Sequence, residues 1–260
     1  CRIALKQTSI DAASFTSIRL VSGALVLWAI AHFFRSNHSG KGNWISALAL
    51  FAYAAGFSFA YISLTAAMGA LLLFGAVQAT MIGHGIWAGE RLQKQQLLGL
   101  ALAFTGLVGL LLPGLSAPPL LGSMLMLIAG ISWGIYSLRG KGAGDPTRVT
   151  AGNFLRASVF TALLSLMLVS QNNLDVAGVW LAIASGAIAS GMGYALWYSV
   201  LPALKATTSA TVQLSVPVIA AIGGILFLGE SISLRLILAS VAILGGIALV
   251  IFNKSQDLNS

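Results

Sequence analysis

The chain has 260 residues, of which 58% are hydrophobic and only 8% are charged, and its mean hydropathy is +0.92. A soluble globular domain carries about a quarter charged residues, so this composition excludes a soluble protein. The formal net charge is +8, but the basic residues are scattered between apolar runs. This scatter favours a role in membrane topology over nucleic-acid binding.

Apolar runs separated by turn and charge signals predict nine transmembrane helices. Residues 44–87 and 97–134 contain no charged side chain, and each stretch exceeds the roughly 20 residues that cross a hydrocarbon core. In chain order, the predicted helices cover residues 12–34, 44–64, 68–88, 95–112, 118–138, 150–170, 177–201, 207–228 and 232–252. The predicted fold class is therefore an all-α polytopic membrane protein.

The chain contains an internal repeat. Residues 66–111 and 206–251 superpose without gaps at an offset of 140, and a second match at an offset of 137 pairs Arg2 with Arg139 and Arg19 with Arg156. The predicted units are residues 1–113 and 118–254. The helix at 118–138 has no partner in the first unit, so we expect a five-plus-five bundle whose first helix is missing from this chain.

Five helices per unit place the two units in opposite orientations across the membrane, which is the inverted-repeat plan of many secondary transporters. Basic residues test this arrangement. One side carries Arg35, Lys41, Arg91, Lys94, Arg139, Lys141, Arg148, Lys205 and Lys254, whereas the other carries only Arg2, Lys6, Arg19 and Arg235. The positive-inside rule makes the first side cytoplasmic, so we expect a multi-pass protein of the cytoplasmic (inner) membrane with a cytoplasmic C-terminus.

Matching Gly-Glu pairs, Gly89-Glu90 and Gly229-Glu230, follow the fourth and ninth helices of the full bundle, and Ser132-Trp133-Gly134 lies in the sixth. With the ten-helix duplication, these residues resemble the EamA family of the drug/metabolite transporter superfamily. The resemblance implies alternating-access transport of a small polar metabolite, such as an amino acid, through a cavity between the halves. It favours export.

A second reading is a non-transporting scaffold or sensor subunit with the same fold, which a solidly packed cavity would favour. A membrane enzyme is not expected, because His32, His38 and His84 lack metal-ligand spacing with carboxylates. We expect no metal or cofactor and no nucleotide-driven step. The expected partners are a small-molecule substrate and membrane lipid. The sequence leaves open whether the protein forms a homodimer.

Polar side chains inside predicted helices are candidates for substrate binding, because the membrane interior penalises them. Gln78 and Gln213 occupy related helices of the two repeats, and Pro217 frees the backbone carbonyl of Gln213 four residues earlier. Either glutamine could bind a polar substrate group, or it could join two helices by a hydrogen bond.

Aromatic and ionisable residues complete the candidate set. Tyr53, Trp133 and Tyr194 are predicted to line the cavity, with the lipid interface as the alternative. His84 lies between two glycines and could couple protons to transport, or it could be a neutral interface residue. Arg19 and its repeat partner could attract an anionic substrate group, but long basic side chains near helix ends usually extend towards the membrane interface, and this second role is the one we expect.

Acidic and small residues are given structural roles. Glu90 and Glu230 are expected to cap the helix that follows each of them. Close helix approaches are expected at Gly99 with Ala103, at Gly245-Gly246, and at Gly186 with Ser190.

Overall fold

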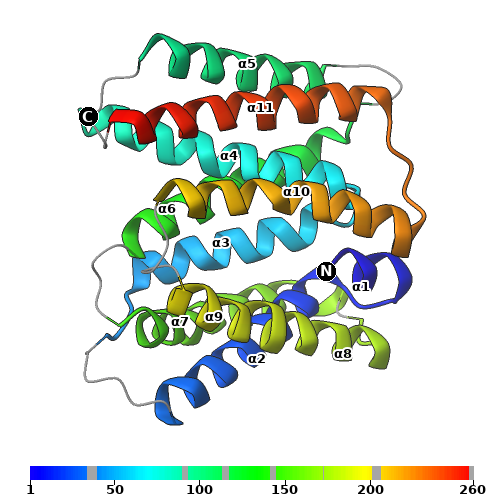
Figure 1. Cartoon of the computed structure of the whole chain (residues 1–260). Helices are drawn as coiled ribbons and strands as arrows, with labels where there is room; N and C mark the ends of the chain where they lie inside the picture. Colours follow the sequence, from blue (N-terminus) through cyan, green and yellow to red (C-terminus); the bar gives the residue numbers. More distant parts are fainter. Residues whose placement is uncertain are drawn as a thin grey trace. The chain divides into compact units, whose positions relative to one another are not determined.

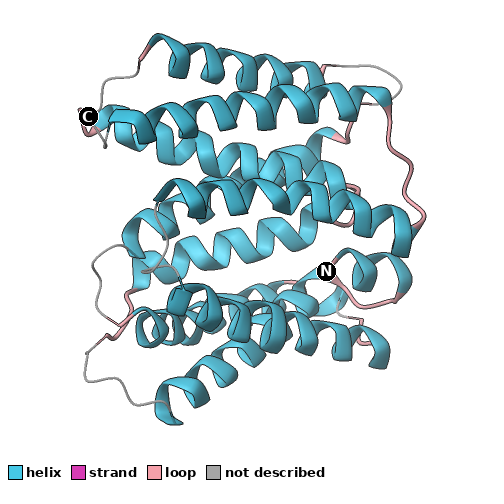
Figure 2. Cartoon of the chain, viewed as in Figure 1, coloured by secondary structure: helices cyan, strands magenta, loops and turns pink. Residues whose placement is uncertain are grey.

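The computed structural model describes residues 1–33, 40–89, 93–112, 117–140, 145–171, 173–200 and 206–257. Within these ranges the regular elements are helices and no strand occurs (Figure 2). In chain order they are α1 (Arg2–Gln7), α2 (Ala12–Phe33), α3 (Trp44–Ala60), α4 (Ala66–Trp87), α5 (Lys94–Leu111), α6 (Leu120–Gly140), α7 (Pro146–Met167), η1 (Val169–Gln171), α8 (Val176–Ala184), η2 (Ser185–Met192), α9 (Gly193–Val200), α10 (Ala206–Leu228) and α11 (Leu234–Asp257). The predicted all-α class is confirmed.

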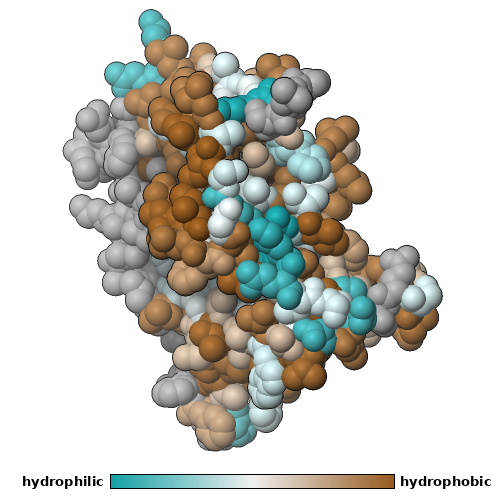
Figure 3. Space-filling view, turned by 90° about the vertical axis from the view of Figure 1, so that its right-hand side faces the viewer, coloured by the Kyte–Doolittle hydropathy of each residue, from teal (hydrophilic) through white to brown (hydrophobic). Residues whose placement is uncertain are grey.

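Seven helical segments of the described chain are long and apolar enough to cross a membrane, and two shorter apolar segments, Trp44–Ala60 and Ser215–Leu228, accompany them. Large apolar side chains are exposed along these helices, including Trp28, Leu25, Leu155 and Phe227. Apolar residues also cover much of the face in Figure 3, with hydrophilic residues gathered in patches between them. Such a surface suits lipid and not water.

All nine predicted helices correspond to observed segments, with shifts of a few residues at their ends. The largest shift at a helix start is in α7, which begins four residues earlier than predicted because Pro146 occupies its first position and Asp145 caps it. The Asp145 side chain accepts a hydrogen bond from the Arg148 amide at 2.9 Å. Two features were not predicted: the short α1, and the π-helical turns of η2 that divide the helix predicted at 177–201.

The chain divides into two compact units, each assembled from segments distant in sequence. Unit 1 comprises residues 1–62 and 135–203, and unit 2 comprises residues 63–134 and 204–260. These units do not coincide with the two predicted sequence repeats, because each unit combines helices from both. Within the units, α2 packs against α7, α4 against α10 and α5 against α11. Each pair joins helices that the repeat alignment makes equivalent.

Unit 1 is built around α2, which contacts α7, η2, α8 and α3 (Figure 1). Phe15 and Phe154 are among its fully buried side chains. Gly186 of η2 lies against the backbone of Arg19 and the hydroxyl of Ser22, where a Cβ atom would collide with both. The expected close approach at Gly186 is therefore confirmed.

Unit 2 contains the pair α5 and α11, which lie side by side in Figure 1. A Cβ atom added to Gly99 would lie 2.5 Å from the Gly246 carbonyl oxygen, and one added to Gly246 would lie 2.6 Å from the Ala103 amide nitrogen. Gly245, in contrast, has nothing within 4 Å. The expected approach is confirmed for Gly99, Ala103 and Gly246, and it does not include Gly245.

Glu230 caps a different helix from the one predicted. Its Oε2 accepts a hydrogen bond of 2.7 Å from the amide of Ala66, the first residue of α4. The next helix, α11, is capped instead by Ser233, whose hydroxyl accepts from the Leu236 amide at 3.2 Å. Gly229 turns the chain after α10 with φ +60°, which glycine adopts without steric cost. Glu90 lies outside the described residues.

Candidate functional site

Arg19 occupies the centre of a polar cluster in unit 1. It lies seven residues after the start of α2, about 10 Å along the helix. Only 7% of its surface is exposed. A charged side chain buried inside a membrane helix is costly and usually marks a functional position.

Two side chains from other helices hold the guanidinium. Nε donates to the hydroxyl of Ser190 at 3.3 Å, and Nη2 donates to the hydroxyl of Tyr53 at 3.1 Å. The guanidinium carbon also lies 5.5 Å from the centre of the Tyr53 ring and 5.1 Å from that of Phe57. At these distances both ring faces attract the cation.

The π-helical segment η2 positions Ser190. Its sequence, Ser185-Gly-Ala-Ile-Ala-Ser-Gly-Met192, consists mainly of small residues. The Ser190 hydroxyl donates to the carbonyl of Ser185, five residues earlier, at 3.1 Å. Gly186 in the same segment lets the backbone of α2 approach. π-Helical turns inside longer helices are frequent at functional sites, because they redirect side chains from the regular helical pattern.

One nitrogen of the guanidinium, Nη1, is buried and makes no hydrogen bond to any described residue. No described carboxylate accepts a hydrogen bond from Arg19, since its recorded acceptors are the two hydroxyls. An unsatisfied buried donor costs about 1–3 kcal/mol, and more when the group is charged. An anionic acceptor would satisfy this donor, and a carboxylate matches the planar donor geometry of arginine best.

The expectation that Arg19 extends towards the membrane interface is wrong. Its side chain turns into unit 1 because Tyr53 and Ser190 offer acceptors there, and two aromatic rings cover it. Arg156, its repeat partner, behaves differently. It is half-buried, and its Nη1 donates to the carbonyls of Lys41 at 2.6 Å and Gly152 at 2.9 Å. Backbone oxygens therefore already satisfy this nitrogen.

Two predicted site residues, Tyr53 and Tyr194, belong to unit 1. Tyr53 is buried and binds Arg19 directly. Tyr194 is half-buried, and its ring packs edge-on against Phe154 with 5.8 Å between centroids. It also lies close enough to Arg19 to interact with it electrostatically. The structure thus brings these two tyrosines around Arg19, which was expected at the membrane interface.

The remaining predicted residues lie in unit 2. Gln78 on α4 is 7% exposed, and no hydrogen bond of its side chain to a described residue is recorded. Trp133 on α6 is half-buried next to Gly134, which packs against Thr80 of α4.

Three further positions in unit 2 concern α10 and α4. Gln213 belongs to α10, but its side chain lies outside the described residues. Pro217 is buried inside α10 as expected. His84 is exposed near the end of α4, with its ring 6.1 Å from that of Trp87. The described residues contain no group of three or more His, Cys, Asp or Glu side chains that could hold a metal ion.

Ser190 and Phe57 were not predicted as partners of Arg19. A signal was present for Ser190, since three glycines, Gly186, Gly191 and Gly193, lie within eight residues around it, a composition that disfavours a regular helix. Phe57 lies four residues after Tyr53, on the same face of a helix. Neither pattern reveals the pairing, because Arg19 and Ser190 are 171 residues apart.

Comparison with known proteins identifies the family. Residues 120–252 match the model of the EamA-like transporter family. A protein of Pseudomonas aeruginosa described as uncharacterized is 57% identical over 252 residues, covering 96% of this chain and 88% of the relative. The threonine/homoserine exporter RhtA of Escherichia coli is 30% identical over 128 residues, which cover 48% of this chain and 43% of the exporter.

A protein of known crystal structure shares the fold with a TM-score of 0.67 at 19% identity, covering 99% of this chain and 92% of its own. The apolar helices, the family match and the relatives agree. The chain belongs to the EamA-like transporter family and is a multi-pass membrane transporter.

Proposed function

We propose that this protein is a secondary transporter for a small amino-acid-like metabolite, and that Arg19 binds the carboxylate of the substrate. The observation that carries the proposal is the buried Nη1 of Arg19, which has no hydrogen-bond partner among the described residues. A carboxylate accepting from Nη1 would satisfy this donor and neutralise the buried charge. Tyr53 and Ser190 would then orient the guanidinium and not supply the binding energy themselves.

Aromatic residues around Arg19 support a small organic substrate over an inorganic anion. Tyr53 and Phe57 of α3 and Tyr61, the residue after its end, form a continuous aromatic row, with successive ring centroids 5.6 Å and 4.7 Å apart. Such a surface can hold the apolar part of a ligand whose carboxylate faces the arginine. An amino acid with a short side chain combines these two features.

Alternating access is the proposed mechanism. Inverted repeats allow two related halves to exchange conformations around a bound substrate, and the packing of α2 on α7, α4 on α10 and α5 on α11 supports the repeat assignment. The excess of basic residues on one side supports a cytoplasmic C-terminus. Export is the proposed direction, because the relative RhtA is described as an exporter of threonine and homoserine.

The test is counterflow in proteoliposomes loaded with unlabelled threonine, homoserine or other amino acids. We expect labelled substrate to accumulate with the wild type. Arg19→Gln should weaken apparent affinity about tenfold to a hundredfold, because a hydrogen bond to a charged group contributes about 1.5–3 kcal/mol. Arg235→Gln is the matched control: Arg235 is a half-buried arginine of unit 2, and its Nε already donates to the Gly109 carbonyl at 3.0 Å.

Equal losses in the two variants would contradict a specific role for Arg19. A wild type that accumulates no member of the panel would favour the non-transporting scaffold. Gln78, Trp133 and Gln213 stay predictions for substrate contacts, and His84 stays a prediction for proton coupling. Single substitutions in the same assay test each of them, and light scattering in detergent tests whether the protein forms a homodimer.

A further inference from the structure

A groove between α2 and α7 in unit 1 is separate from the residues that surround Arg19. Its volume is about 890 Å³. Apolar side chains line most of its length: Val21, Ala24, Leu25 and Trp28 from α2, and Ala151 and Leu155 from α7. Leu25 and Leu155 are 62% and 66% exposed, so the described chain leaves this apolar surface uncovered.

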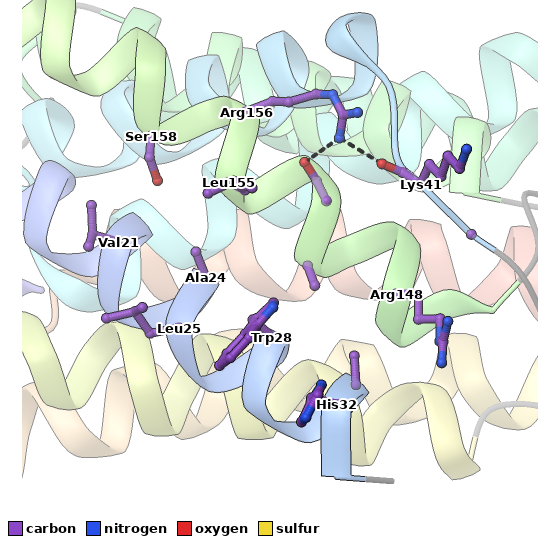
Figure 4. A pocket seen from close by; sticks show the side chains of 14 residues that line it. Val21, Ala24, Leu25, Trp28, His32, Lys41, Arg148, Leu155, Arg156 and Ser158 are labelled. Atoms are coloured by element: carbon purple, nitrogen blue, oxygen red, sulfur yellow. Dashed lines mark hydrogen bonds between the residues drawn. The ribbon is translucent and has the colours of Figure 1, made fainter. Parts of the chain in front are cut away.

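Basic side chains gather at one end of the groove. Lys41 and Arg148 belong to its lining, and His32 stacks on Trp28 with 5.4 Å between ring centroids and an interplanar angle of 15°. Figure 4 shows Trp28 and His32 next to each other on α2, and Arg148 on the facing helix α7. This end holds the last turn of α2 and the first turn of α7, where the positive-inside rule places the cytoplasmic surface.

Arg148 and Arg156 differ in how far their donors are satisfied. The Nη1 of Arg156 is occupied by two backbone carbonyls, drawn as dashed lines in Figure 4. The Nε of Arg148 is buried and has no hydrogen-bond partner among the described residues. A bound anion would satisfy the buried Nε of Arg148.

We propose that this groove binds an anionic phospholipid of the cytoplasmic leaflet, with the phosphate on Arg148 and Lys41 and an acyl chain along Val21, Leu25 and Leu155. The dimensions agree. From His32 to Val21 the helix rises about 16 Å, which is roughly half of a 30 Å hydrocarbon core and hence the depth of one leaflet. A free anion would leave the apolar part of the groove empty. A zwitterionic lipid such as phosphatidylcholine also has a phosphate, but its choline cation would lie beside Arg148 and Lys41 and be repelled by them.

The experiment measures lipid binding to the purified protein in detergent, by thermal shift and by native mass spectrometry. The three probes are dioleoyl phosphatidylglycerol, dioleoyl phosphatidylcholine and glycerol 1-phosphate. We expect saturable stabilisation by phosphatidylglycerol alone. One basic contact near an anionic membrane surface corresponds to about a fivefold change in affinity, so Arg148→Gln should weaken binding about fivefold and the double variant with Lys41→Gln about 25-fold.

Lys94→Gln is the matched control, because Lys94 is an exposed basic residue on the same predicted side but belongs to unit 2. It should bind phosphatidylglycerol like the wild type, whereas Leu155→Gln should weaken binding through the apolar part of the groove. Equal stabilisation by phosphatidylcholine would overturn the proposal in favour of unspecific lipid contact. Full stabilisation by glycerol 1-phosphate would instead indicate a site for soluble phosphate esters, and unchanged binding by Arg148→Gln would exclude this groove. The experiment measures lipid binding and not transport. Its result is therefore independent of whether Arg19 binds the carboxylate of a transported amino acid.

Discussion

Neighbouring glycines on α11 should respond in opposite directions to the same substitution. Gly246 faces α5, where an added Cβ atom would collide with the Gly99 carbonyl and lie 2.6 Å from the Ala103 amide nitrogen. Gly245 has nothing within 4 Å. Because the atoms around Gly246 belong to the helix backbone, they can move only if α5 and α11 separate.

The expected magnitudes follow from these contacts. Overpacking a close contact costs about 1–3 kcal/mol, so Gly246→Ala should destabilise the protein by about that amount. At Gly245 no collision opposes the change, and alanine stabilises a helix interior by up to about 1 kcal/mol relative to glycine. The two variants should therefore differ by about 1–4 kcal/mol in unfolding free energy.

The assay is reversible unfolding in mixed detergent micelles, followed by far-ultraviolet circular dichroism. Both variants carry the same added methyl group on the same helix, so effects of detergent and hydrophobicity cancel. Equal stabilities for Gly245→Ala and Gly246→Ala, or a stabilised Gly246→Ala, would refute the close packing of α5 on α11.

Three further outcomes test other contacts. Burial raises the pKa of Asp11, but hydrogen bonds from Ser14 and from backbone amides outweigh burial and lower the pKa below its usual 3.8; the stability that Asp11 contributes is thus present above about pH 4 and lost as pH falls through the lowered pKa, and Asp11→Asn should flatten this acid limb in a pH series of melting temperatures. Glu230→Gln removes the charged acceptor at the start of α4 and should cost about 0.5–2 kcal/mol in unfolding free energy. Tyr53→Phe leaves a second nitrogen of Arg19 without a partner and should cost about 1–3 kcal/mol in the same assay.

The helices could be predicted from sequence because a membrane span is a local property. Each needs about 20 apolar residues between polar breaks, and the two Gly-Glu pairs mark equivalent ends. Gly89 and Gly229 both adopt positive φ, 93° and 60°, so the repeated motif corresponds to a repeated turn. The family resemblance rested on the same local signals and is confirmed.

The candidate site was harder to predict because its contacts are distant in sequence. Arg19 was expected near the interface from its place in the helix alone, but its position is decided by Tyr53, 34 residues away, and by Ser190, 171 residues away. Glu230 likewise accepts from the Ala66 amide across 164 residues. Pairings of this kind depend on which helices pack together, which residue spacing does not encode.

Charge recognition by Arg19 is tested most directly by the binding affinities of threonine and of threonine amide, measured by calorimetry on the wild type and on Arg19→Gln. The amide lacks the carboxylate but keeps the amino group and side chain. We predict that the wild type prefers threonine at least about tenfold, since a charged hydrogen bond is lost with the amide, and that Arg19→Gln binds the two compounds about equally. An undiminished preference in Arg19→Gln would contradict carboxylate binding by Arg19.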